Sequence, residues 1–156
     1  MRKLLLIGLL SAGACSSRTV EVPAPSPAPS PVAASNAPGA ATPRGALDAF
    51  MNAIKSQDLQ AMSGVWGNKD GPVRESKVFS REEMEQRELY LVRCLKHDRY
   101  RVLGDSPAAD NERVLTVELV RGTVTKVTDF YTARGGDRWY VRSANMEPVR
   151  DLCSTK

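Results

Sequence analysis

Apolar residues in the segment 43–56 recur at the spacing of one face of a helix. The residues on this face are Leu47, Phe50, Met51 and Ile54. Thr42 and Pro43 favour a helix start here, because Thr caps helix N-termini and Pro is tolerated at the first helical position. Asp58 can cap a second, shorter helix, which Gly67 is expected to end before a loop over residues 68–72.

A third helix is predicted to begin at Ser80. Ser80 and Glu83 have the spacing of a capping box, in which each side chain satisfies the other residue's backbone N–H. The apolar stripe of this helix consists of Met84, Leu91 and Leu95, broadened near its end by Leu89, Tyr90, Val92 and Cys94. The breadth of this apolar surface predicts that the helix is covered from more than one side.

After His97 and Asp98 the apolar period changes from helical to two, which predicts strands. The strands are expected at residues 100–103, 114–120, 123–133 and 139–141, with turns at 104–107, 121–122 and 135–137. In the third strand the apolar face shifts between Val124, Val127 and Phe130, which indicates a bulge. Helices followed by an antiparallel meander predict an α+β domain, with the N-terminal helices packed on one face of a curved antiparallel sheet.

The first fifteen residues have the order of a secretory signal. Arg2 and Lys3 supply positive charge, residues 4–10 are apolar, and small residues lead up to Cys15. Seven apolar residues are too few to span a bilayer, which takes about 20 in a helix. We therefore expect residues 1–14 to be a signal peptide that is removed, and the rest of the chain to fold outside the cytoplasm.

The residues before Cys15 allow two interpretations. Ala12 to Ala14 fit the A-x-A pattern of signal peptidase, which would release a secreted protein with Cys15 as a free N-terminal thiol. They also resemble the lipobox of bacterial lipoproteins, in which the Cys receives the lipid, although Ala12 stands where Leu is usual. We expect a lipid on Cys15 that anchors the protein to a membrane of the bacterial cell envelope. Ser16 after the Cys resembles lipoproteins sorted to the outer membrane of diderm bacteria.

Residues 15–42 form a segment rich in Pro, Ala and Ser. Its prolines are Pro23, Pro25, Pro27, Pro29, Pro31 and Pro38. Proline fixes φ and removes backbone donors, and the segment lacks large apolar residues that could form a core. These features predict a disordered linker, followed by a single folded domain over residues 43–156 that is large enough for one core.

The chain has three cysteines, Cys15, Cys94 and Cys153. If Cys15 carries lipid, the other two can form a disulfide in an oxidising compartment. The alternative is two buried free thiols, because unpaired Cys is among the most buried residue types. Two cysteines and the single His97 have no zinc-like spacing, so neither a metal nor a cofactor is expected.

The charge of the chain does not indicate nucleic-acid binding. There are 22 basic and 18 acidic residues, and removal of Arg2 and Lys3 with the signal leaves 20 against 18, a net charge of +2. The basic residues are scattered among acidic ones rather than gathered with aromatics on one stretch.

Two parts of the domain resemble the nuclear transport factor two superfamily, whose members include SnoaL-like and cystatin-like cone domains. The opening resembles it in residues 46–54, 58–62 and Trp66, and the close in Phe130-Tyr131 and the segment 138–141. The resemblance covers most of residues 43–145 and implies helices on a curved sheet that forms a cone. It implies no single activity, because the superfamily includes isomerases, cyclases, dehydratases and non-catalytic binding domains.

Few residues offer catalytic chemistry. Asp129 and Tyr131 would share one face of the third strand, and His97 is the remaining candidate. Each also has a structural explanation: Asp129 as a solvent-facing strand residue, and His97 as a residue favoured near a helix C-terminus by the helix dipole. Trp66, Trp139 and Tyr140 are assigned to the core. The sequence contains no phosphate loop, nucleophile elbow or metal signature.

We therefore predict a membrane-anchored envelope lipoprotein whose α+β domain is a non-catalytic module that binds a small apolar ligand or an envelope protein. The alternative is a small periplasmic enzyme of the isomerase or cyclase type that uses a pocket of the cone. The two differ in the pocket, because an enzyme needs convergent polar groups there.

Overall fold

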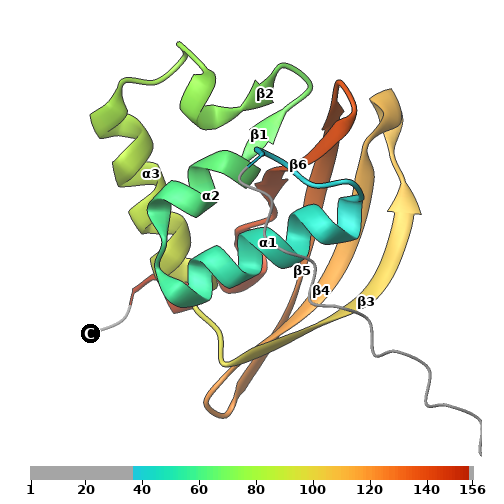
Figure 1. The fold of residues 1–156 in the computed structure, drawn as a ribbon. Helices are drawn as coiled ribbons and strands as arrows, with labels where there is room; N and C mark the ends of the chain where they lie inside the picture. The colour runs from blue at the N-terminus through green and yellow to red at the C-terminus, as the bar shows by residue number, and fades with distance from the viewer. Residues whose placement is uncertain (1–36, 155–156) are drawn as a thin grey trace, which may run out of the picture. The chain divides into compact units, whose positions relative to one another are not determined.

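The computed structural model describes residues 37–154 (Figure 1). The predicted signal peptide, Cys15 and the linker as far as residue 36 lie outside the described residues. As predicted, the described chain is α+β, with helices first and a sheet of antiparallel strands after them. The helices are α1 (Pro43–Ser56), α2 (Leu59–Val65), α3 (Arg81–Leu95) and α4 (Arg150–Cys153), with the 3-10 turns η1 (Val73–Glu75), η2 (Ala109–Asn111) and η3 (Glu147–Val149).

The first two helices begin where the capping residues predict. The Thr42 hydroxyl accepts a hydrogen bond from Gly45 N at 3.0 Å, and the Asp58 carboxylate accepts one from Ala61 N at 2.9 Å. Gln57 separates the helices in a left-handed conformation, at φ +58°. The four residues of the predicted apolar face of α1 are all buried in the core.

Helix α2 ends just before Gly67, as predicted, but the segment after it is not the predicted loop. The helix ends at Val65, and Gly67 instead begins a short hairpin of β1 (Gly67–Asn68) and β2 (Gly71–Pro72), within the segment expected to be a loop. A Cβ on Gly67 would lie 2.3 Å from the Gly71 carbonyl oxygen. Glycine is therefore required here for the close approach of two backbones rather than for ending a helix.

Helix α3 has the predicted capping box. Ser80 N donates to the Glu83 carboxylate at 2.8 Å, and Glu83 N donates to the Ser80 hydroxyl at 3.2 Å. The broad apolar end of the helix is covered only in part: Val92 and Leu95 are buried, whereas Leu89 and Tyr90 are 49% and 47% exposed.

A four-stranded antiparallel sheet has the order β3-β4-β5-β6. Its strands are β3 (Arg99–Pro107), β4 (Arg113–Arg121), β5 (Val124–Gly135) and β6 (Arg138–Ala144). Strand β4 alternates as predicted, with Leu115, Val117 and Leu119 buried. Strand β3 does not end at Gly104, because a bulge at Leu103 lets its pairing with β4 continue to Pro107.

The predicted bulge in β5 is not present against β4, since the register of these strands is unbroken from Val124 to Thr132. The shift lies instead on the other side of β5, where Arg142 of β6 is the extra residue. The apolar pattern is irregular because Lys126 and Thr128 occupy inward positions and find polar partners there. Lys126 Nζ lies 2.8 Å from the Asp151 carboxylate, and the Thr128 hydroxyl donates to the Asn145 carbonyl.

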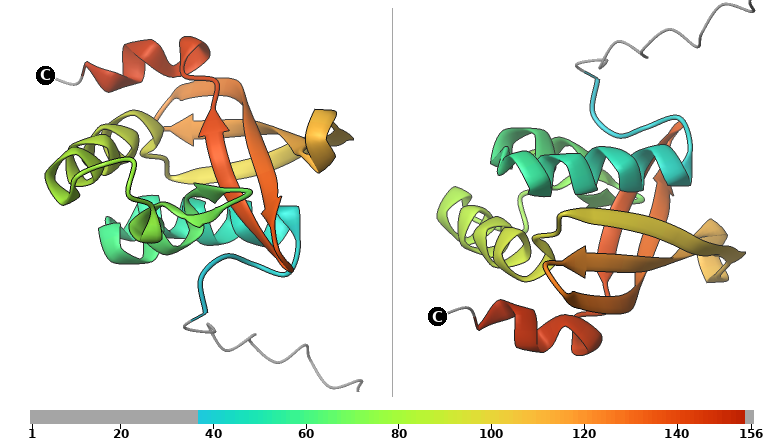
Figure 2. Two further views of the ribbon diagram at one scale, coloured as in Figure 1. Left: turned by 90° about the horizontal axis from the view of Figure 1, so that it is seen from above. Right: turned by 90° about the horizontal axis from the view of Figure 1, so that it is seen from below.

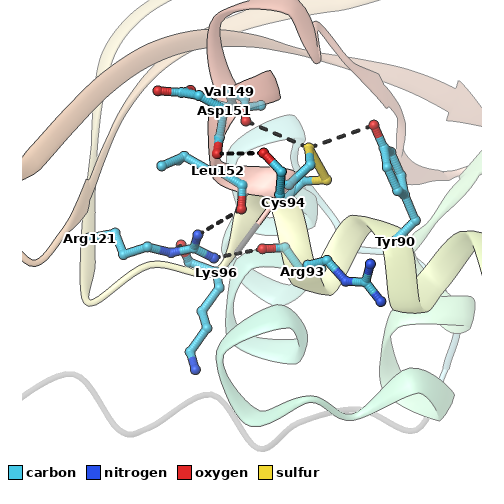
Figure 3. Close-up of a disulfide and its surroundings, with 10 residues drawn as sticks. Tyr90, Arg93, Cys94, Lys96, Arg121, Val149, Asp151 and Leu152 are labelled. Atoms are coloured by element: carbon cyan, nitrogen blue, oxygen red, sulfur yellow. Dashed lines mark hydrogen bonds between the residues drawn. A yellow bond between two sulfur atoms is a disulfide. The ribbon is translucent and has the colours of Figure 1, made fainter. Parts of the chain in front are cut away.

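The C-terminal segment is attached to α3. In both views of Figure 2, α3 lies at one end of the sheet with α1 on one side of it and α4 on the other. The sulfur atoms of Cys94 and Cys153 are 2.20 Å apart, so the cysteine pair that the sequence predicts lies at disulfide distance. Beside it, the Arg121 guanidinium donates to the carbonyl oxygens of Arg93 and Lys96, and to that of Leu152 (Figure 3).

The chain also contacts the domain just before α1, in residues that the composition assigns to the linker. Gly39 N donates to the Gly64 carbonyl at 2.8 Å, and Ala40 forms a bridge with Trp139. Within residues 37–154, no helix has both the length and the apolar composition that crossing a bilayer requires.

Candidate functional site

A pocket of about 530 Å³ lies between α3 and the end of β6. Its lining residues come from α1, the residue after α2, α3, β6 and the segment after β6. They are Phe50, Trp66, Glu83, Gln86, Arg87, Tyr90, Leu91, Val141, Arg142, Ser143, Ala144 and Met146. Three of the larger apolar lining residues, Phe50, Trp66 and Met146, are far apart in the sequence, so the pocket exists only in the folded domain.

The apolar part of the pocket is held by aromatic contacts. Phe50 packs edge-to-face on the core residue Phe130, with ring centroids 6.3 Å apart. Trp66 stacks on Phe79 at 6.4 Å, and its indole N–H donates to the Arg142 carbonyl at 3.3 Å. The stacking fixes the plane of the Trp66 ring, and the hydrogen bond fixes the direction of its N–H. Trp66 therefore connects the end of α2 to the edge strand β6.

Helix α3 supplies the opposite wall. Glu83, Gln86, Arg87, Tyr90 and Leu91 follow one another at helical spacing, so they share one face of α3. The helix is fixed at its N-terminus by the capping box. At its other end, the carbonyl bonds to Arg121 and the contact of Cys94 with Cys153 tie it to the sheet and to α4.

The pocket is lined by three charged side chains, Glu83, Arg87 and Arg142, and of these only Arg142 forms an ion pair within the described residues. Hydrogen bonds from the backbone and side chain of Ser80 lower the pKa of Glu83, so this carboxylate is ionised and already satisfied. Arg142 forms an ion pair with Glu112 at 2.7 Å. The Arg87 guanidinium lies 4.3 Å over the ring centroid of Phe79, and no ion pair of Arg87 is present among residues 37–154.

A buried carboxyl group lies on another face of α3. Glu88 is only 3% exposed, and its Oε1 has no hydrogen-bond partner within the described part of the chain. Burial, with a smaller contribution from the charge of Glu85, raises the pKa of Glu88 to about 7. Glu88 is not among the residues that line the pocket.

Asp129 and Tyr131 share a face of β5, but that face is turned away from the buried core. The Thr116 hydroxyl donates to the Asp129 carboxylate at 2.7 Å across the strand pair. The Arg142 guanidinium lies 5.5 Å from the ring centroid of Tyr131. Neither Asp129 nor Tyr131 lines the 530 Å³ pocket.

His97 is buried beyond the end of α3. Its Nδ1 is 2.9 Å from the Leu95 carbonyl, and its ring meets that of Tyr100 edge-to-face at 5.4 Å. Burial lowers the pKa of His97, which favours the neutral imidazole. Tyr100 in turn donates to the Asp48 carboxylate at 2.6 Å, so these side chains tie β3 to α1 rather than contribute to the pocket.

The sequence reasoning missed the residues that line the pocket. Of the three aromatic residues predicted in the core, Tyr140 is buried, and Trp66 and Trp139 are partly buried and pack against the core; Trp66 also lines the pocket. The capping box fixes the residue at which α3 begins, and the helical period then predicts that Arg87 and Tyr90 lie on one face. No motif or periodicity in the sequence around these two residues, however, predicts that β6 lies opposite them.

Among residues 37–154, no three His, Cys, Asp or Glu side chains are close enough to hold a metal ion together. No protein-family model matches the sequence, and no curated protein or solved structure matches it either. The resemblance to the nuclear transport factor two superfamily therefore stays a prediction.

Proposed function

We propose that this chain is a lipid-anchored protein of the bacterial envelope whose domain binds a ligand without transforming it. The observation that carries the proposal is the pocket between α3 and β6, with an apolar interior and a rim that includes Arg87, a cation that forms no ion pair among the described residues. Such a site suits an occupant with an apolar part and a negatively charged part, because the apolar part loses its water and the charge finds Arg87.

The polar groups around the pocket support binding more than catalysis. Glu83, the one carboxylate of the lining, is occupied by the cap of α3, and its lowered pKa suits a permanent anion. General acid–base catalysis needs a group whose pKa lies near the working pH. Glu88 has such a pKa but lies outside the lining.

A fluorescent apolar probe tests the proposal. We expect 1-N-phenylnaphthylamine to bind the full chain at one site with increased emission. Leu91→Trp fills the pocket and should weaken binding at least tenfold, which corresponds to about 1.4 kcal/mol. Leu89→Trp is the matched control, because Leu89 is on the same helix, does not line this pocket and is half exposed.

Two results would overturn the binding proposal. One is a wild-type chain that does not bind the probe, and the other is equal binding by Leu91→Trp and the wild type. The enzyme alternative has its own assay, in which enone isomerisation and lactone hydrolysis substrates are incubated with the wild type, Asp129→Asn and His97→Gln. Turnover that is lost in one of these variants would favour the enzyme.

A further inference from the structure

The edge strand of the sheet passes from a covered to an open section beside the pocket. At Trp139 the edge of β6 is covered by Ala40, with backbone N···O distances of 2.7 and 2.9 Å in the two directions. At Val141 it is covered by the bridge to Trp66. Ser143 and Ala144 follow, and both line the pocket.

Ala144 lines the pocket, and its neighbours in the strand show which way its backbone groups are directed. Ser143 is paired with Tyr131 of β5, and Asn145 N donates to the Asp129 carbonyl at 2.8 Å. Alternate residues of a strand direct their N–H and C=O groups to opposite sides. Ala144 therefore directs these groups away from β5. The carbonyl oxygen of Arg142, the extra residue of the bulge, also faces away from β5 and accepts a hydrogen bond from the pocket residue Trp66.

A site between a helix and an open strand edge suits an extended peptide. A peptide strand there would exchange backbone hydrogen bonds with Ala144 and continue the sheet beyond β6. Every second side chain would then point toward one face. On the inward face these side chains would meet Phe50, Leu91 and Met146.

The charged side chains at the pocket rim favour a peptide that carries an acidic residue. The ion pair with Glu112 neutralises Arg142, and Glu83 accepts hydrogen bonds at the helix cap. Arg87 is then the charged lining residue that forms no ion pair within the described residues, although the charge of Glu83, one helical turn before it, acts on it. A carboxylate side chain on the bound strand would supply that charge.

We propose that the pocket binds an extended peptide segment with apolar and acidic residues, which adds to the sheet as a strand beside Ala144. This inference depends on the proposed binding function and names the class of partner. It differs from that function in requiring the partner's backbone N–H groups, which an apolar small molecule does not have.

Selection from a randomised decapeptide library on the full chain, with Leu91→Trp as counter-selection, supplies the probe. We expect the selected peptides to combine apolar residues with Asp or Glu. N-methylation of the peptide bond whose N–H donates to the Ala144 carbonyl should weaken binding at least tenfold, and N-methylation of the neighbouring peptide bonds less than about twofold. Arg87→Gln should weaken acidic peptides severalfold and leave their Asn or Gln analogues unchanged.

Amide exchange of the protein gives an independent readout. The Ala144 amide should exchange fast in the free chain and slow at least tenfold with a saturating selected peptide. The Asn145 amide, which already donates to Asp129, is the internal control.

The outcomes separate this inference from the proposed function. If 1-N-phenylnaphthylamine binds but no peptide is selected, the pocket takes small molecules and the peptide inference is wrong. It is equally wrong if all N-methylated peptides bind alike, or if the chain self-associates through β6. Loss of probe binding as well would remove the proposed function itself.

Discussion

At the scale of single residues, Arg121 has a structural role that its place in the sequence does not reveal. It is the last residue of β4, and its guanidinium donates to Arg93 and Lys96 at the end of α3 and to Leu152 in α4 (Figure 3). The carbonyl groups at a helix C-terminus lack partners within the helix, and a cation is favoured there by the helix dipole. Arg121 therefore joins the sheet to both helices.

Replacing Arg121 with Met should lower the free energy of unfolding by about 2–3 kcal/mol, because three carbonyl groups lose a charged donor. Arg101→Met is the control, since Arg101 forms an ion pair with Glu118 at 3.2 Å but is mostly exposed. The control should cost no more than about 1 kcal/mol. Urea unfolding measures both values, and equal losses would show that Arg121 is an ordinary surface residue.

Glu88 predicts a dependence of stability on pH. In the folded chain its pKa is raised to about 7, above the ordinary 4.5, mainly by burial. Between these values the unfolded state releases the proton and the folded state keeps it. The contribution of Glu88 to stability is therefore fully present below pH 4.5 and falls by on the order of 3 kcal/mol as the pH rises to about 7, whereas the lowered pKa of His97 acts in the opposite direction below about 6.5.

Glu88→Gln should remove most of this slope, because an amide of the same shape does not ionise. Glu85→Gln is the control, since Glu85 is exposed on the same helix and should leave the slope largely in place. Thermal unfolding over this pH range measures the effect. A fall in stability with rising pH that persists in Glu88→Gln would mean that other groups cause it.

Residue-scale predictions from the sequence succeed where the partner is local. The caps at Thr42, Asp58 and Ser80 each involve a residue three positions away, so a short motif contains the whole interaction. Arg121 and Glu88 depend on elements that are distant in the sequence, and their residue types alone indicate exposed positions. No periodicity or motif indicates the donors that Arg121 supplies.

At the scale of elements, the contact of Cys94 in α3 with Cys153 in α4 predicts a stabilising disulfide. The cysteines are separated by 59 positions, and closing such a loop stabilises by about 4 kcal/mol in the chain-entropy model. The double variant Cys94→Ala/Cys153→Ala should lose about this amount in thermal unfolding. Reductant should destabilise the wild type and leave the double variant unchanged.

Thiol labelling of the denatured, unreduced chain provides the chemical check. Neither Cys94 nor Cys153 should react in material from the native compartment. Labelling of both would show that the alternative of free thiols is right and that α4 is held by Arg121 and packing alone.

Element types were predictable, whereas their ends and irregularities depended on tertiary partners. Strand β4 is confirmed because one of its faces is uniformly apolar and buried. Strand β3 continues past Gly104 because β4 is long enough to pair with it. The predicted bulge in β5 was wrong because Lys126 and Thr128 are polar residues at inward positions, and their polar partners come from the C-terminal segment.

At the scale of the whole molecule, the anchor at Cys15 remains a prediction, because this residue lies outside the described residues. Cys15→Ser should move the protein from the membrane fraction to the soluble fraction, since the lipid would have no attachment site. The Cys94→Ser variant controls for loss of a thiol elsewhere. Identical fractionation of Cys15→Ser and the wild type, or a mature N-terminus without acyl mass, would contradict the anchor.

The pocket also belongs to this scale, and the sequence could not predict it. Helix α3 and strand β6 are each predicted by their own periodicity, but their facing arrangement depends on how the whole sheet packs against the helices. The sequence candidates Asp129 and Tyr131 are polar residues on a recognisable strand face, whereas Trp66 and Arg87 gain their significance only from their neighbours in space.

A chemical-shift map of the isotope-labelled full chain tests the central claim most directly, because it locates the site without assuming it. On titration with 1-N-phenylnaphthylamine and with a selected acidic peptide, we predict shifts concentrated at Trp66, residues 83–91 and residues 141–146. Shifts centred on Asp129 and Tyr131 or on His97, with those segments unchanged, would contradict the assignment of the pocket between α3 and β6.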